Sequence, residues 1–427
     1  MIISPHFPPV NAADMHRVRQ SVPYFLNYGW EPTIIAVNPK YVEAPQDGLL
    51  VKSIPHNTRI IWVNALSSKY TRKVGLGSLA LRSILFYWFT VNKLLKRERF
   101  DLIYFSTTQF PIPILGYYWK KKFNIPYIID MQDPWHSDYY LSKPKYERPP
   151  KFWFSYYLNK FTESIAMKSV NGIIAVSANY HKELRLCYPN IHENYCKTIT
   201  FGAYPLDIEI ANKINMINPA IRIDEKKINI VYVGAVGTIM QNTITALTKA
   251  VKISATQHGQ TMDKCKFHFI GTSYASNDSY TVMPFAKKED VADYFFEHPG
   301  RIPYFEALNI ISRADIVLMV GSDNPNYTAS KLYPYVLAKK PLLAIFHEQS
   351  SVVSIIRHLN CGEVITFSNV TDIDTLAQNI SLKINELILK IPFTPDTNWK
   401  NFEEYTAETK TKQQVGIFNA VIGPSFE

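Results

Sequence analysis

The sequence has little glycine, little cysteine and no zinc-binding pattern. Only 16 of its 427 residues are glycine, which argues against collagen-like and glycine-rich repeat architectures. The cysteines form no CxxC pair and no His/Cys spacing typical of a metal site. We therefore expect neither a disulfide framework nor a structural zinc site, and a reducing compartment is the natural location. The four cysteines are Cys187, Cys196, Cys265 and Cys361.

Two further absences narrow the class of protein. No secretory signal is recognised at the start of the sequence. No G-x-G-x-x-G motif is present, although a pyrophosphate-binding dinucleotide turn would need one. A sugar-nucleotide epimerase or dinucleotide enzyme built on paired Rossmann units is therefore only a minor alternative.

The composition is that of a folded protein with large cores. Hydrophobic residues make up 47%, aromatic residues 14% and charged residues 19%, which is too little charge for a disordered chain. At about 100–200 residues per domain, this length predicts two or three domains.

The positive charge is confined to the first half of the chain. Residues 1–203 hold 25 Lys/Arg and 13 Asp/Glu, whereas residues 204–427 hold 21 and 23. Such asymmetry indicates an acidic partner for the first half, of which an anionic membrane and nucleic acid are the usual examples. No nucleic-acid-binding module is found, so no nucleic-acid partner is expected. A solvated basic face is the alternative.

Apolar runs typical of buried strands alternate with helical patterns along the whole chain. Strands are predicted at 1–3, 31–38, 101–106, 125–130 and 172–177, and again at 228–234, 266–271, 315–320 and 341–346. Helices are predicted at 14–28, 111–123, 157–169, 242–256, 290–296, 304–313, 331–339 and 399–418. The pattern predicts an α/β protein with two doubly wound parallel sheets.

The break in this pattern suggests the domain boundaries. We expect an N-terminal Rossmann-like domain at 1–203, a second at 204–398, and a C-terminal helix or tail at 399–427. Ligands of such folds bind at the carboxyl ends of the strands, so a cleft between the two domains is the expected site.

Short motifs in a fixed order carry a resemblance to a known family. Residues 330–344, SKLYPYVLAKKPLLA, resemble a segment of the GT-B glycosyltransferases, especially glycosyltransferase family 4. Further matching motifs lie at 100–103, 126–130, 175–177, 231–234, 269–271, 301–304 and 314–316. The ordered series carries the resemblance, which implies the GT-B fold, with the acceptor bound by the first domain and a nucleotide-sugar by the second.

The resemblance places the donor site on the loops of the second domain. Ser330 and Lys331 would add a hydroxyl and a positive charge to a diphosphate at the start of a helix; a capping Ser330 and a solvated Lys331 are the alternative. The candidate donor-binding residues are Gly234, Gly237, Thr238, Gly271, Thr272, Arg301, Ile302, Tyr304, Asn326, Tyr327, Thr328, Ala329, Ser330, Lys331 and Pro334.

This sequence departs from the family pattern at the donor site. Asn326 and Pro334 stand where the family has a pair of glutamates spaced E-x7-E. Pro334 falls near the first turn of its helix, where the missing N–H costs little. The segment 234–241 lacks the Arg and Lys that neutralise the leaving diphosphate in the family, which leaves Arg301 and Lys331 as candidate catalytic cations.

The acceptor side has its own candidates. Asn11 and Asp14 stand at the first loop, where family members commonly carry two glycines, and Arg17 lies one turn further along the helix. Asp133 and His136 follow the strand at 125–130. We expect catalytic roles for Asp133 and His136, although Asp133 as a loop former and His136 as a packing residue remain alternatives.

Two basic and aromatic segments bear on the partner. The segment 69–99 has an apolar centre at 84–89, with Lys and Arg residues on both sides of it. This centre is far shorter than the roughly 20 residues that a transmembrane helix needs. The segment 143–157 mixes cations with aromatic residues, as interfacial segments do. A core helix with a basic rim is one interpretation. The other is a peripheral contact with an anionic membrane that brings a lipid-linked acceptor to the protein.

The resemblance implies a retaining, metal-independent hexosyltransferase without cofactor, cytoplasmic or peripheral on the inner face of the plasma membrane. Its partners would be a nucleotide-sugar donor and a surface polysaccharide or lipid-linked glycan. The altered positions Asn326 and Pro334 leave open a second interpretation, a non-catalytic GT-B subunit of a glycan-assembly complex.

Overall fold

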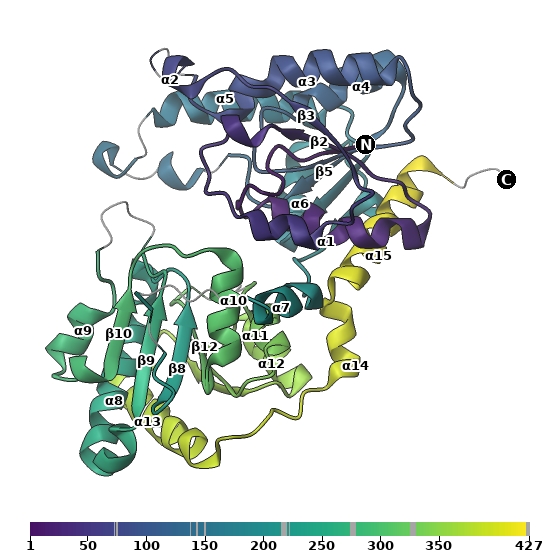
Figure 1. Cartoon of the computed structure of the whole chain (residues 1–427). Coiled ribbons are helices and arrows are strands. Elements are labelled where there is room, and N and C mark those ends of the chain that lie inside the picture. Colours follow the sequence, from purple (N-terminus) through teal and green to yellow (C-terminus); the bar gives the residue numbers. More distant parts are fainter. Residues whose placement is uncertain are drawn as a thin grey trace. The chain divides into compact units, whose positions relative to one another are not determined.

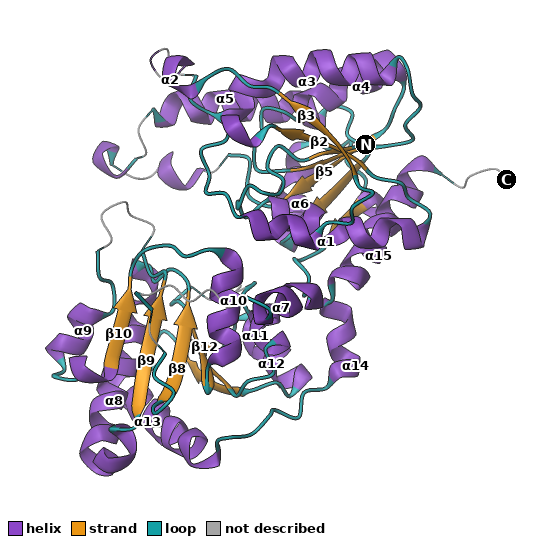
Figure 2. Ribbon diagram, in the orientation of Figure 1, coloured by secondary structure: helices purple, strands orange, loops and turns teal. Residues whose placement is uncertain are grey.

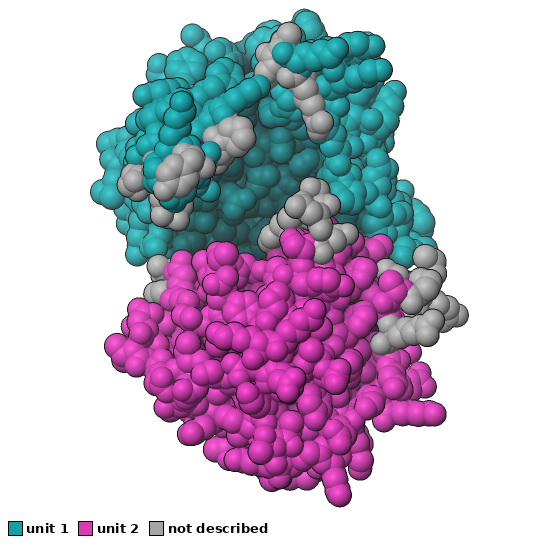
Figure 3. Space-filling model, turned by 90° about the vertical axis from the view of Figure 1, so that its left-hand side faces the viewer, with its two compact units in different colours: residues 1–202, 406–427 teal, residues 203–405 magenta. Residues whose placement is uncertain are grey.

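The computed structural model describes the chain except for residues 72, 74, 75, 137, 142, 143, 149, 150, 215–219, 222, 274–278, 325–329 and 424–427. It divides into two compact units (Figure 3). Unit 1 comprises residues 1–202 and 406–427, and unit 2 comprises residues 203–405.

Unit 1 is built on a seven-stranded sheet with the order β3-β2-β1-β4-β5-β6-β7, in which every pairing is parallel. Its strands are β1 Ile2–Ile3, β2 Thr33–Val37, β3 Arg59–Val63, β4 Ile103–Ser106, β5 Tyr127–Met131, β6 Gly172–Ala175 and β7 Cys196–Thr198. Its helices are α1 Met15–Phe25, α2 Ser68–Thr71, α3 Leu79–Leu95, α4 Ile114–Phe123, α5 Phe152–Met167, α6 Ala178–Cys187 and α15 Ala407–Ile422. Helices α3, α4 and α5 form a layer at the top of Figure 1, and α1 and α15 lie together below the sheet.

The C-terminal helix is part of the core of unit 1. The Phe418 ring packs against Phe25, Trp30 and Tyr104, with centroids 5.9, 5.3 and 5.0 Å away. Gln414 Nε2 also donates to Ser21 Oγ at 2.9 Å, which ties α15 to α1. The C-terminal helix therefore packs on the first unit, as the resemblance to the GT-B fold implies.

Unit 2 contains a six-stranded parallel sheet with the order β10-β9-β8-β11-β12-β13, and the arrows of β8, β9 and β10 point the same way in Figure 2. Its strands are β8 Ile228–Val233, β9 Cys265–Ile270, β10 Phe295–His298, β11 Ile316–Val320, β12 Leu342–His347 and β13 Glu363–Phe367. Its helices are α7 Pro205–Asn212, α8 Gln241–Met262, α9 Met283–Lys288, α10 Tyr304–Arg313, α11 Leu332–Leu337, α12 Ser351–Leu359, α13 Ile373–Lys390 and α14 Trp399–Phe402. Short 3-10 helices include Leu26–Tyr28, Asp138–Leu141, Thr238–Met240, Ala292–Tyr294 and Glu403–Tyr405.

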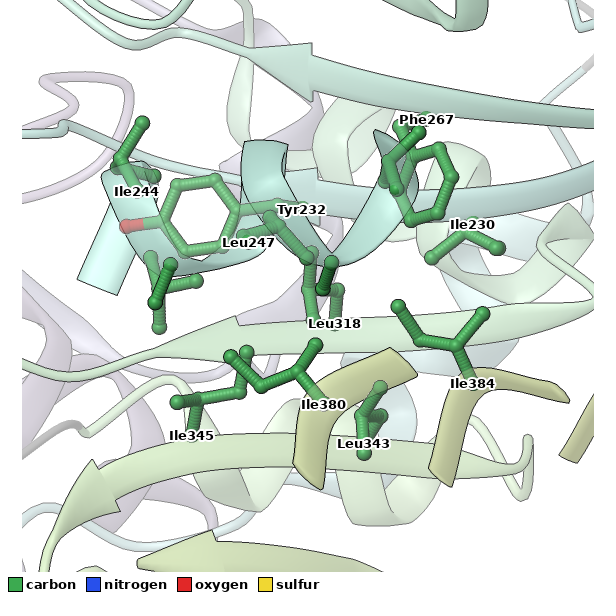
Figure 4. Packing of buried hydrophobic residues seen from close by; sticks show 14 of the residues in the cluster. Ile230, Tyr232, Ile244, Leu247, Phe267, Leu318, Leu343, Ile345, Ile380 and Ile384 are labelled. Carbon is green, nitrogen blue, oxygen red and sulfur yellow. The ribbon is translucent and has the colours of Figure 1, made fainter. Parts of the chain in front are cut away.

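The main core of unit 2 lies between its sheet and the helices α8 and α13. Ile244 and Leu247 of α8 and Ile380 of α13 pack onto strand side chains that the pattern of continuous apolar runs predicts to be buried (Figure 4). The labelled strand residues are Ile230, Tyr232, Phe267, Leu318, Leu343 and Ile345. This packing leaves the loops at the carboxyl edge of the sheet to form a site.

The predicted α/β fold with two doubly wound parallel sheets is confirmed, but two predicted elements are wrong. The helix predicted at 399–418 is divided into α14 Trp399–Phe402, the 3-10 turn Glu403–Tyr405 and α15 Ala407–Ile422, because Thr406 is extended (ψ 152°) and caps the start of α15. Residues 290–296 form a 3-10 turn, Ala292–Tyr294, followed by strand β10. Asp290 has a left-handed backbone conformation (φ 60°), which interrupts a helix, and Phe295 pairs with Phe267 of β9. The helix predicted at 331–339 is also shorter, since α11 spans only Leu332–Leu337. Among the described residues no helix is both long and apolar enough to cross a membrane.

Candidate functional site

A lysine lies over the carboxyl end of β8 in unit 2. Lys331 comes directly before α11, and its Nζ donates to the Tyr232 hydroxyl at 3.2 Å and lies 4.8 Å from the centre of that ring. Gly234 directly follows β8, and a Cβ added to it would overlap Lys331 Nζ. Glycine at position 234 therefore lets the lysine side chain cross the backbone.

The environment of Lys331 leaves its charge available to a ligand. Burial lowers the pKa of Lys331 to about 8, so the amine is still mostly protonated near neutral pH. Within the described part of the chain no carboxylate forms an ion pair with it. An anion at this edge of the sheet would supply the missing counter-charge.

The helix that follows Lys331 is attached to the same strand. The backbone N–H of Val233 donates to the Tyr335 hydroxyl at 2.9 Å, and that hydroxyl lies 3.2 Å from the carbonyl oxygen of Val233, to which it donates. Tyr335 is buried and belongs to α11. These contacts fix the start of α11, and hence Lys331, against the end of β8.

A buried glutamate organises the next loop of this edge. Glu297 of β10 accepts hydrogen bonds from the side chains of Thr272 (2.6 Å) and Thr281 (3.0 Å). It also accepts the backbone N–H groups of Thr281, Val282 and Met283 at 2.8 to 3.0 Å. The carboxylate thus joins the loop after β9 to the start of α9.

The remaining donor candidates lie on the same edge of unit 2. Gly237 and Thr238 are exposed in the loop after β8 and line a pocket of about 290 Å³. Gly271 directly follows β9 and has a left-handed φ of 69°. Arg301 is exposed and follows β10, and Ile302 beside it is buried.

Three further candidates belong to the starts of helices. The Tyr304 hydroxyl donates to Asp207 Oδ2 at 2.8 Å, so this side chain connects α10 to α7. Pro334 is the third residue of α11, where an N–H has no partner within the helix, as predicted. Ser330 is exposed beside Lys331. Asn326, Tyr327, Thr328 and Ala329 lie outside the described residues.

In unit 1, Asp14 is a buried organising carboxylate at the start of α1. It contacts His6 Nδ1 at 2.8 Å and accepts the Thr108 N–H at 3.1 Å and the Thr107 and Thr108 hydroxyls at 3.2 Å. Burial alone would raise the pKa of Asp14, but the contacts with His6 and Thr108 outweigh it and lower that pKa. Asp14 therefore joins the loops after β1 and β4 as an ionised carboxylate.

The next acceptor-side candidates are buried in structural contacts. Arg17 Nε lies 2.7 Å from Asp130 Oδ2, and both side chains are almost completely buried. The same guanidinium donates to the carbonyl oxygens of Ile199 at 2.7 Å and Thr200 at 3.2 Å. Asn11 is also buried, and its backbone N–H donates to the carbonyl oxygen of Pro45 at 2.8 Å. Arg17 thus connects the carboxyl end of β5 with the residues that follow β7.

Asp133 and His136 lie in the loop after β5. Asp133 is exposed, and partial loss of solvent together with the nearby Asp14 carboxylate raises its pKa. His136 Nδ1 lies 3.2 Å from Glu163 Oε2, and Glu163 also accepts the Tyr188 hydroxyl at 3.0 Å. His136 and Glu163 line a pocket of about 620 Å³ in unit 1. The loop thus carries an exposed carboxylate and a histidine that contacts Glu163.

The structure brings some candidates together and adds others. Lys331 and Gly234 meet, and Asp14 and Asp133 are close enough to influence each other electrostatically. Tyr232, Tyr335 and Glu297 were not predicted as site residues, because their contacts join residues far apart in sequence. Two features of the sequence could have indicated these residues. Glu297 is a charged residue next to two phenylalanines, and Tyr232 and Tyr335 lie within the motifs 231–234 and 330–344. Among the described residues no group of three or more His, Cys, Asp or Glu is placed to hold a metal ion.

The Gly234→Ala substitution tests the contact between this position and Lys331. The φ of +134° and the overlap with Lys331 predict a loss of about 1–3 kcal/mol in the free energy of unfolding, together with weaker anion binding as Lys331 is displaced. Gly237→Ala is the matched control for the free energy of unfolding, because its φ is −89° and its nearest neighbour would be an ordinary 3.8 Å contact. Urea denaturation and calorimetry measure the variants, and equal losses of stability at the two glycines would contradict this account.

Several solved structures share the fold of this chain. A glycosyltransferase from Rickettsia africae ESF-5 is similar over 99% of both chains, with 16% identity and a TM-score of 0.56. A UDP-forming α,α-trehalose-phosphate synthase from Burkholderia xenovorans has 9% identity and a TM-score of 0.57 over 98% of this chain and 99% of that one. WaaG, a glycosyltransferase involved in lipopolysaccharide biosynthesis, has 13% identity and a TM-score of 0.51 over 97% and 95%. The fold is that of the GT-B glycosyltransferases.

The family comparison concerns unit 1. Residues 18–199 match the model of Glycosyltransferase Family 4, and no curated protein matches the sequence. Together with the fold, this match confirms the resemblance to GT-B, family 4-like glycosyltransferases.

Proposed function

We propose that the protein is a retaining, metal-independent glycosyltransferase that moves a sugar from a nucleotide-sugar bound by unit 2 to a polysaccharide or lipid-linked glycan bound by unit 1. The observation that carries the donor assignment is Lys331, a largely buried cation held over the end of β8 without a carboxylate partner in the described residues. Ligands of open α/β sheets bind at this edge.

The chemistry of transfer gives Lys331 its role. Negative charge grows on the diphosphate as the bond to the sugar breaks, and a fixed cation stabilises that charge. The loop 234–241 contains no Lys or Arg, so Lys331, with Arg301 as second cation, supplies the charge. Tyr335 and Tyr232 hold Lys331 in place before the donor arrives.

On the acceptor side, Asp133 and His136 are proposed to orient and deprotonate the attacking hydroxyl. The raised pKa of Asp133 makes it a better proton acceptor than an ordinary carboxylate, and Glu163 orients the His136 ring. These groups and Lys331 would act on different substrates.

A nucleotide panel tests the donor assignment. Purified protein in buffer containing EDTA is titrated with UDP, GDP, CMP and UDP-, GDP- and TDP-sugars, beside Lys331→Ala and the exposed-lysine control Lys287→Ala. A ligand at 100 times its Kd should raise the free energy of unfolding by about 2.7 kcal/mol. Binding of one nucleotide class that Lys331→Ala weakens and Lys287→Ala does not would support the proposal. Silence across the panel would overturn it.

The second candidate function is a non-catalytic GT-B subunit. It is favoured by Asn326 and Pro334, which stand where the resemblance implies a pair of glutamates. Nucleotide-sugar binding without transfer or donor hydrolysis would favour this candidate over the transferase.

The Asp133→Asn and His136→Ala substitutions separate the two substrates. We expect each to lower kcat by about 10²–10⁴-fold, the range of a lost general acid or base, while the Kd of the nucleotide stays unchanged. Transfer assays and calorimetry on the same preparations check the two quantities. A parallel loss of nucleotide affinity would show that these residues act through the fold or the donor instead.

A further inference from the structure

One face of unit 1 carries large apolar side chains that no part of the described chain covers. Helices α3, α4 and α5 lie side by side on one face of the sheet (Figure 1). Trp88 of α3 meets Tyr118 of α4 with ring centres 5.9 Å apart, which makes the layer continuous. The outward side chains are Leu85, Phe89, Trp153, Phe154, Tyr157 and Phe161, each 48–68% exposed. We call this surface the α3–α5 face.

The charges on this helix layer have one sign. Lys93 of α3, Lys121 and Lys122 of α4, and Lys160 of α5 are all exposed. The sole carboxylate within the three helices is Glu163, which is buried with His136 and Tyr188. The α3–α5 face therefore presents aromatic rings among cations, with no exposed negative charge from its own helices.

We propose that the α3–α5 face rests on an anionic lipid bilayer. Trp, Tyr and Phe side chains favour the boundary between headgroups and acyl chains, and each lysine near an anionic surface adds attraction. A protein partner fits less well, because the cores of protein interfaces are depleted in lysine. No described helix crosses a membrane, so the contact is peripheral.

A groove connects the α3–α5 face with the polar edge of the sheet. It has a volume of about 450 Å³ and is lined by Leu81 of α3, Phe154 and Leu158 of α5, and Thr108. Thr108 follows β4 and donates to Asp14, so the groove leads from exposed aromatic residues to the acceptor-side loops. The bilayer would thus deliver a lipid-linked acceptor directly to this edge of the sheet. This delivery of the acceptor rests on the proposed function, whereas the binding of the α3–α5 face to lipid is independent of it.

Vesicle flotation of the full chain tests the aromatic part of the face. Vesicles of phosphatidylcholine alone are compared with vesicles that also contain phosphatidylglycerol. Phe89→Ser combined with Phe161→Ser should weaken binding to the anionic vesicles by about 10-fold or more. Leu382→Ser combined with Leu389→Ser is the matched control, because these leucines are 63% and 79% exposed on α13 of unit 2 and should leave binding unchanged.

A charge reversal tests the electrostatic part. Lys121→Glu combined with Lys122→Glu should lower the partition coefficient by about 25-fold or more, since each lysine contributes about 1 kcal/mol near an anionic surface. Lys287→Glu combined with Lys288→Glu changes the same charge on α9 of unit 2 and should have little effect. Binding should also fall as salt is added.

The outcomes separate this proposal from the proposed function. Absence of binding to anionic vesicles, or equal losses in the control variants, would overturn the bilayer contact. Self-association that only the α3–α5 variants abolish, without vesicle binding, would assign the face to a second copy and overturn it too. Nucleotide binding is measured in parallel. If the chain binds vesicles but no nucleotide, the bilayer contact is supported and the transferase proposal is overturned. If it binds a nucleotide but no vesicles, the transferase proposal is supported and the bilayer contact is overturned.

Discussion

The Lys331→Ala variant is expected to bind the nucleoside diphosphate about 10- to 100-fold more weakly than the unsubstituted chain and to lose about 10²–10³-fold in kcat. The larger loss in kcat is expected because negative charge grows on the diphosphate as the sugar leaves. Lys331→Arg keeps the charge, but its planar guanidinium differs in shape from the amine that crosses Gly234. We therefore expect Lys331→Arg to recover binding only partly. Calorimetry and a transfer assay measure both variants.

The pH dependence of donor binding gives an independent check on Lys331. Its pKa of about 8 means that the amine is charged below that pH and loses its proton above it. Affinity for the diphosphate should therefore be complete below pH 8 and decline as pH rises through 8, and Lys331→Ala should lack this decline. An unsubstituted chain whose affinity is flat from pH 7 to pH 9 would argue against a role for this amine.

The Asp130→Asn substitution is expected to lower the free energy of unfolding by about 3–5 kcal/mol. Asp130 is fully buried and pairs with the equally buried Arg17, and it also accepts hydrogen bonds from Ser106 and Gln132 at 2.8 and 2.9 Å. Removing its negative charge leaves the Arg17 guanidinium buried without a counter-charge. Urea denaturation measures the loss.

Two further variants distinguish a lost ion pair from general damage to the sheet. Arg17→Met combined with Asp130→Asn removes both charges and should recover part of the stability, because no isolated buried charge remains. Asp101→Asn is the exposed control at the start of the neighbouring strand and should change the free energy of unfolding by less than about 0.5 kcal/mol. If the double variant is less stable than Asp130→Asn alone, the burial of Arg17 contributes in some other way.

The fold was predictable because its signals are local. Continuous apolar runs mark buried parallel strands, and the helical segment predicted at 14–28 ends in the structure at Gly29, whose left-handed φ of 76° suits a glycine. Residues 290–296 were mispredicted because the helical pattern there is overruled by a left-handed Asp290 and by pairing of Phe295 with β9. That pairing is a tertiary interaction and leaves no periodic trace in a single sequence.

The site was only partly predictable, for the same physical reason. Lys331 stands in a recognisable motif, but its partner Tyr232 lies 99 residues earlier and belongs to another motif. The sequence predicts Arg17 as an acceptor-side residue, whereas in the structure its guanidinium is buried in an ion pair with Asp130. Individual motifs identify candidate residues, and only the three-dimensional contacts show which charges are already neutralised.

The crossing of Gly234 by Lys331 has a consequence for the divergence of related chains. A side chain at position 234 would occupy the space of the lysine amine, and Tyr232 lies beneath that amine. Substitutions at the three positions are therefore not independent during evolution. Relatives that keep the lysine should keep the glycine, whereas relatives with a larger residue at position 234 should have replaced the lysine and taken their cation from another loop.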